Sequence, residues 1–151
     1  MKTYKLNFTT DYYQFYILDS QTKATTDADD FWNDEANERR LAIGEGLLGV
    51  TIGTFGKVNA EIRLLDKKSV ENPNANHCVE ASIKLVSNKL QFKNCSNYET
   101  QLEIELEKEN YRIRIASFGL DTISGEEGND YYEIEIWKSK IAKPKLLKKH
   151  T

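Results

Sequence analysis

Residues 101–115 read QLEIELEKENYRIRI, and this stretch decides the fold class. Apolar residues alternate with charged or polar ones on both sides of a polar turn at 108–110: Leu102, Ile104 and Leu106, then Tyr111, Ile113 and Ile115. A period of two places successive side chains on opposite faces of a strand. The stretch therefore predicts an antiparallel hairpin with one buried face, and with glutamate and arginine side chains paired across its wet face.

The same alternation recurs along the chain. It appears in the ranges 4–8, 14–19, 47–54, 58–64, 79–85, 90–92 and 132–136. Turn signals such as Gly53–Gly56 and Asn72–Asn74 separate these runs. We therefore predict a mainly β protein, an antiparallel two-sheet β-sandwich of about nine strands, with a single domain over residues 1–137.

One segment has a helical pattern. Asn33 or Asp34 is a suitable N-terminal cap for a helix that runs to about Ala42. The glycine pattern that follows, GEGLLG at 44–49, spells a dinucleotide-binding fingerprint. That fingerprint normally follows a strand and opens a helix, whereas here it follows the helix and enters a strand. We interpret these glycines as a turn and predict one short helix.

Charge is distributed unevenly. The formal net charge is -3, yet the last fourteen residues, 138–151, contain six lysines and no acid. Residues 1–137 therefore carry fifteen bases and twenty-four acids, a net charge of -9. An acidic surface disfavours phosphate backbones, so we expect no direct nucleic-acid binding by residues 1–137. We expect the basic tail 138–151 to be flexible.

Several classes of protein are disfavoured by what the chain contains. No run approaches the roughly 18 apolar residues of a membrane span, so we expect no membrane partner and a cytoplasmic location. Cys78, Cys95 and His77 lack the spacing of a zinc site or a catalytic triad. We therefore expect reduced thiols, no metal, no cofactor and no enzymatic activity, while a catalytic carboxylate pair stays a third alternative.

Two clusters of acids contain no base and indicate a protein-binding surface. The first acidic cluster is Asp27, Asp29, Asp30, Asp34 and Glu35, next to Phe31 and Trp32. The second acidic cluster is Asp121, Glu126, Glu127 and Asp130. Carboxylates steer the association of a cationic protein and pair with its arginines and lysines. We predict that both clusters contact a basic partner, and we interpret Trp32 as packing between helix and sheet.

Two short motifs carry a family resemblance. The segment Tyr12-Tyr13-Gln14-Phe15, followed by Trp32-Asn33-Asp34-Glu35-Ala36 and a glycine-bearing turn, resembles the competence protein J family. That family consists of small β-sandwiches that inhibit a nuclease, and related bacterial proteins are immunity partners of nuclease toxins. The resemblance implies an immunity or inhibitor protein of a toxin-antitoxin kind. Its partner would be a cognate nuclease or nuclease toxin, occluded at its cationic active site.

A binding module of another class is the main alternative. Exposed aromatic side chains of a β-sandwich can stack on sugars, and Tyr12, Tyr16, Tyr131 and Trp137 are available for such a face. A carbohydrate- or ligand-binding module without catalysis would use them together. It would bind with little dependence on salt, whereas an acidic protein contact would weaken steeply as ionic strength rises.

Overall fold

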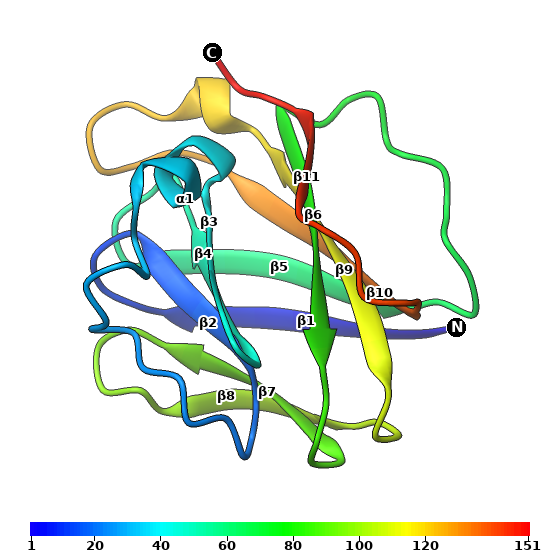
Figure 1. Ribbon diagram of the computed structural model, residues 1–151. Coiled ribbons are helices and arrows are strands. Elements are labelled where there is room, and N and C mark those ends of the chain that lie inside the picture. Colours follow the sequence, from blue (N-terminus) through cyan, green and yellow to red (C-terminus); the bar gives the residue numbers. More distant parts are fainter.

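The computed structural model describes residues 1–151 and confirms the β-sandwich (Figure 1), with eleven strands rather than about nine. The six-stranded sheet has the order β1 (Lys2–Thr9), β5 (Lys57–Leu64), β10 (Tyr131–Lys138), β9 (Asn110–Phe118), β6 (His77–Lys84) and β11 (Lys145–Lys148). The five-stranded sheet has the order β3 (Leu41–Gly44), β4 (Leu47–Thr51), β2 (Gln14–Asp19), β7 (Lys89–Asn94) and β8 (Thr100–Glu105). All paired strands are antiparallel except β5 and β10, which run parallel.

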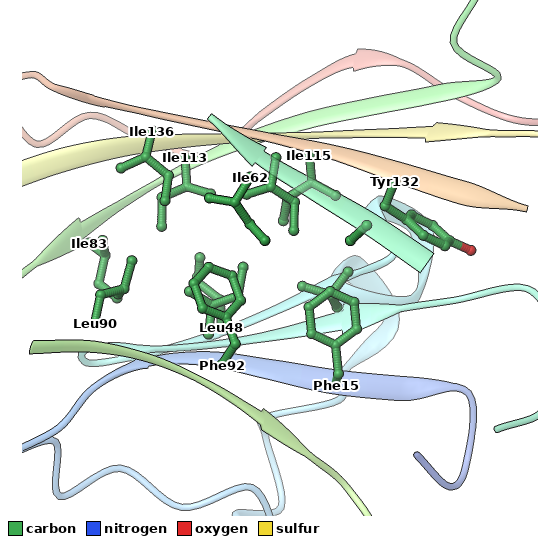
Figure 2. Packing of buried hydrophobic residues seen from close by; sticks show 14 of the residues in the cluster. Phe15, Leu48, Ile62, Ile83, Leu90, Phe92, Ile113, Ile115, Tyr132 and Ile136 are labelled. Atoms are coloured by element: carbon green, nitrogen blue, oxygen red, sulfur yellow. The ribbon is translucent and has the colours of Figure 1, made fainter. Parts of the chain in front are cut away.

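The hydrophobic core lies between the two sheets. A cluster of 23 buried residues fills this space, and Figure 2 shows Phe15, Leu48 and Phe92 of one sheet opposite Ile62 and Ile113 of the other. Each of these side chains points into the core, and the side chains before and after it along the strand point to the opposite face of the sheet, as the period of two requires. Complete burial of one such side chain stabilises the folded state by about 1.5–3 kcal/mol relative to leaving it exposed to water.

The predicted hairpin at 101–115 is wrong, although both of its strands exist. They are β8 and β9, and they belong to different sheets. β8 pairs with β7, whereas β9 lies between β6 and β10. Two strands joined by a short turn can be hydrogen-bonded neighbours in one sheet, or they can belong to the two sheets of a sandwich and pack through their side chains. The alternation is the same in both cases, so it does not identify the hydrogen-bonded partner.

The arginines of β9 consequently pair with a different strand. Glu80 of β6 accepts hydrogen bonds from Arg112 Nε at 3.1 Å and from Arg114 Nε at 2.9 Å. These side chains point away from the core, yet only 4% of the Glu80 side chain and 2% of the Arg114 side chain are exposed. They are covered because the chain lays two further segments over this face: Arg114 donates to Ser69 O, and Arg112 donates to Ala142 O.

The basic tail is part of the fold, so the prediction of a flexible segment is wrong for its second half. Residues 145–148 form β11, which pairs with β6. Leu146 packs against the main core, and Leu147 packs against a small outer cluster around Phe118. The unpaired edge of β6 offers backbone donors and acceptors, and two leucines supply the apolar contact that holds the strand there.

Removal of residues 145–151 is therefore expected to lower the free energy of unfolding by about 2 kcal/mol, because it exposes the β6 edge and both leucine contacts. Urea denaturation measures this change. The control replaces Lys145 and Lys148, whose side chains are exposed, by serine and should change stability by less than about 0.5 kcal/mol. A truncated protein as stable as the full chain would contradict the role of β11.

The predicted helix is confirmed and is shorter than expected. α1 spans Asp34–Arg39, and the Asn33 side chain caps it by accepting a hydrogen bond from Ala36 N at 2.8 Å. It ends at Arg40, which adopts a left-handed conformation with φ of 59°, and Leu41 already begins β3. The glycine pattern that follows turns between β3 and β4, with Gly46 at φ of 70°. The other helix is a single 3-10 turn, η1 (Leu120–Thr122), and neither helix is long and apolar enough to cross a membrane.

Candidate protein-interaction site

The first acidic cluster lies on a segment that packs against the outer face of the five-stranded sheet. Figure 1 shows this segment running from the end of β2 up to α1. Phe31 and Trp32 hold it there by packing on Gly49 of β4: a Cβ at Gly49 would lie 2.9 Å from the Trp32 ring and 3.0 Å from the Phe31 ring. Phe31 is buried with Tyr16 and other residues in a second apolar cluster, against which Trp32 packs. Trp32 is thus a packing residue, as its motif suggests.

The carboxylates of this cluster are free to contact a partner. All five of its residues are exposed. One of them, Glu35, forms an ion pair, with Arg39 at 3.7 Å. Asp34 and Glu35 occupy the first turn of α1, where the helix dipole favours negative charge. Four carboxylates therefore remain without an ion-pair partner within the chain.

The second acidic cluster lies on η1 and the loop that follows it. Asp121, Glu126 and Glu127 are exposed. The loop is fixed by a short bridge between Ser124 and Glu127 and by Phe55 N, which donates to Glu126 O at 2.9 Å. These three acids are therefore presented by a loop with its own hydrogen bonds rather than by a strand.

Asp130, the fourth residue of that cluster, has an internal role. It is 6% exposed, and its carboxylate accepts hydrogen bonds from Gly53 N at 3.0 Å and Thr54 Oγ1 at 2.7 Å. The Tyr132 hydroxyl donates to the same carboxylate. Burial, reinforced by this hydrogen bond, raises the pKa of Tyr132. Asp130 thus anchors the 53–56 turn, and its buried carboxylate is not available to a partner.

α1 and η1, which carry residues of the first and second acidic clusters, lie at the same end of the sandwich (Figure 1), and the last residues of the tail contact both elements. Lys149 forms an ion pair with Glu38 of α1 at 3.3 Å, and His150 contacts Asp121 of η1 at 3.0 Å. The basic end of the tail is therefore positioned beside the acids that the sequence assigned to a partner. Sequence reasoning missed this arrangement, since only Leu146 and Leu147 indicate that the tail docks.

His77 connects these elements. It is 1% exposed, and its Nε2 lies 2.7 Å from the carbonyl oxygen of Arg39 at the end of α1. A carbonyl only accepts, so Nε2 carries the hydrogen and Nδ1 is free to accept from His150 N at 3.1 Å. Burial lowers the pKa of His77, and the charges of Arg40, His150 and Lys149 lower it further, against the opposing effect of the Arg39 carbonyl.

This lowered pKa predicts a loss of stability in acid. The folded state favours the neutral imidazole, so the contribution of His77 is fully present above its unfolded pKa of about 6.5 and is lost as the pH falls below it. The free energy of unfolding should decrease between pH 7 and pH 5, and His77→Gln should show a smaller decrease. Urea denaturation at both pH values measures it. An equal decrease in the two proteins would contradict the assignment.

The aromatic residues considered for a sugar-binding face do not form one. Tyr16 and Trp137 are buried, at 4% and 5% exposure. Tyr12 and Tyr16 belong to the β2 region of one sheet, whereas Tyr131 and Trp137 lie on β10 of the other. Tyr131 stacks on Phe118 at 4.9 Å between ring centroids. The alternative of a carbohydrate platform built from these four side chains is therefore wrong.

These observations define the class: a small, mostly antiparallel β-sandwich whose acidic loops and single short α-helix gather at one end. Among solved structures it is similar to ComJ from Bacillus subtilis, an inhibitor of the DNA-degrading activity of NucA, with a TM-score of 0.71 and 17% identity over 91% of this chain and 98% of that one. It is also similar to the protein of crocagin biosynthetic gene J, with a TM-score of 0.61 and 15% identity over 93% of this chain and 100% of that one. No protein-family model and no curated protein sequence matches the chain. The predicted resemblance to competence protein J is confirmed at the level of the fold.

Proposed function

We propose that this chain is an inhibitor or immunity protein that binds a cognate nuclease and covers its cationic active site. The observation that carries the proposal is the fold shared with ComJ over nearly the whole chain. The end of the sandwich that bears both acidic clusters is the proposed contact surface. Its residues are the five acids of the first cluster together with Asp121, Glu126 and Glu127.

Electrostatics supports this assignment. A nuclease presents basic side chains to a polyanionic substrate, and exposed carboxylates compete for those same side chains. The acids at 27–35 are exposed and mostly unpaired within the chain, so their charge is available to steer association. Inhibition would then be steric occlusion, without turnover, cofactor or metal, and it would take place in the cytoplasm of a bacterial cell.

An inhibition assay tests the proposal. The purified chain is mixed with the nuclease encoded by the adjacent reading frame, and cleavage of plasmid DNA and of RNA is followed. We expect complete inhibition at a 1:1 ratio, and an association rate that falls steeply as ionic strength rises from about 0.05 to 0.5 M. Full cleavage of both substrates in the presence of excess chain would contradict the proposal.

A further inference from the structure

The turn between β1 and β2 holds two bulky residues in an unfavourable backbone conformation. Tyr12 has φ of 56° and Tyr13 has φ of 57°, the left-handed region in which side chains other than glycine and asparagine are rare. Tyr12 is also 73% exposed, so its ring is not kept there by the core. Strained residues of this kind concentrate at binding sites, where the surrounding structure maintains them.

The two tyrosines line a hollow next to the first acidic cluster. The hollow has a volume of about 290 Å³, and its walls are Tyr12, Tyr13, Gln14, Trp32, Asn37 and Thr51. Asp34 is three residues before Asn37 and so lies on the same face of α1. The Trp32 indole N–H is buried and has no hydrogen-bond partner in the protein. Aromatic rings and amide side chains thus line one space, and the Asp34 carboxylate lies on the helix face next to it.

The aromatic surface continues toward the second acidic cluster. The Tyr13 and Phe55 rings meet edge to face, with 5.4 Å between centroids. Phe55 is 46% exposed, and its backbone N–H donates to Glu126 O. We call Tyr12, Tyr13, Trp32 and Phe55 the aromatic seam. It runs from Trp32, two residues after Asp30 of the first acidic cluster, to Phe55, which is hydrogen-bonded to Glu126 of the second.

We propose that the aromatic seam holds an arginine side chain of the nuclease and is the anchor of the contact. A guanidinium stacks on aromatic faces, and adjacent carboxylates compensate its charge. Interface energy concentrates in such desolvated aromatic anchors, while surrounding charges govern the rate of encounter. The inference deepens the proposed function and rests on it, since it adds to the acids a site that slows dissociation.

Tyr12→Gly and Phe55→Ser test the anchor. Glycine accepts the left-handed conformation without steric cost, so Tyr12→Gly should leave the melting temperature unchanged or raise it. The same variant should raise the Kd for the nuclease at least 30-fold, about 2 kcal/mol, mainly through faster dissociation. The matched control is Tyr131→Ala, which removes a tyrosine that is 43% exposed on β10 and should leave the Kd unchanged.

The outcomes separate this inference from the proposed function. Wild-type inhibition together with a Kd unchanged by Tyr12→Gly and Phe55→Ser would overturn the anchor and leave the inhibitor proposal standing. If the wild-type chain inhibits no nuclease, titration with N-acetyl-arginine amide tests the seam alone. We then expect a saturable NMR shift of the Trp32 indole N–H, absent in Tyr12→Gly, with Trp137 as the internal reference. No shift, or an equal shift with N-acetyl-leucine amide, would overturn the inference.

Discussion

Replacement of Asp29, Asp30 and Asp34 by lysine is expected to weaken binding to the nuclease about 1,000-fold, equivalent to about 4 kcal/mol. Each substitution removes an attraction to the partner's basic side chains and adds a repulsion. These three acids are exposed and form no ion pair within the chain, so nothing in the free protein offsets the change. Surface plasmon resonance measures the effect, which should appear first in the association rate and diminish at high salt.

The fold should survive this triple substitution. Replacement of an exposed charged residue changes the free energy of unfolding by about 0.5 kcal/mol or less. Replacement of Asp34 should cost about 0.3–1 kcal/mol more, because its negative charge lies in the first turn of α1. The matched control replaces Glu103, Glu105 and Glu107 by lysine, which changes the net charge equally but on the β8 side, away from α1 (Figure 1). Equal weakening by both variants would show that only overall charge matters. Unchanged inhibition by the first would move the contact toward Asp121–Glu127.

Glu80→Ala is expected to lower the free energy of unfolding by about 3–5 kcal/mol, because it leaves buried arginines without their counter-charge. The Glu80 carboxylate is shared between Arg112 and Arg114, whose side chains are 8% and 2% exposed. Arg114 also has a partner in Glu135 at 3.3 Å and lies over the Trp137 ring at 5.2 Å. These contacts involve Arg114 alone and leave Arg112 without a carboxylate partner, so the loss of stability should remain large.

A second variant separates the buried ion pairs from ordinary surface pairs. Glu61 contacts Arg63 at 2.8 Å on the same sheet, but its side chain is 30% exposed. Glu61→Ala should therefore cost about 1 kcal/mol or less. Urea denaturation of both variants gives the comparison, and a loss below about 1 kcal/mol for Glu80→Ala would show that Glu135 suffices for Arg114.

The alternation of apolar and polar residues predicted where the strands lie, but it did not predict which strands pair with each other. Leu102, Ile104, Ile113 and Ile115 all lie on the side of their strands that faces the core cluster or packs against it, as the alternation indicates. The same alternation suggested that β8 and β9 pair, yet they belong to opposite sheets. Side-chain periodicity records which face of a strand is buried. It contains no information about which edge receives the hydrogen bonds.

Local chemistry also located the helix and the exposed acids. Asn33 caps α1 through a contact three residues away, and such short-range interactions can be recognised in a sequence. Asp27 to Glu35 is exposed at each of its acidic positions, as expected for a polar connection. Asp130 looks no different in the sequence, but it is buried because Gly53 and Thr54, from a turn far away in the chain, supply hydrogen bonds to its carboxylate.

The sequence by itself thus determined the fold class, the position of the cap and the acidic character of residues 1–137, because these depend on residue type and on neighbours within a few positions. Only the tertiary structure decided that Glu80 partners both arginines of β9, that the basic tail closes the edge of β6, and that Tyr13 meets Phe55 in the aromatic seam. Each of these features brings together segments distant in the chain. Their contacts are set by how the two sheets pack and by which backbone groups remain unpaired, and residue order alone does not specify either.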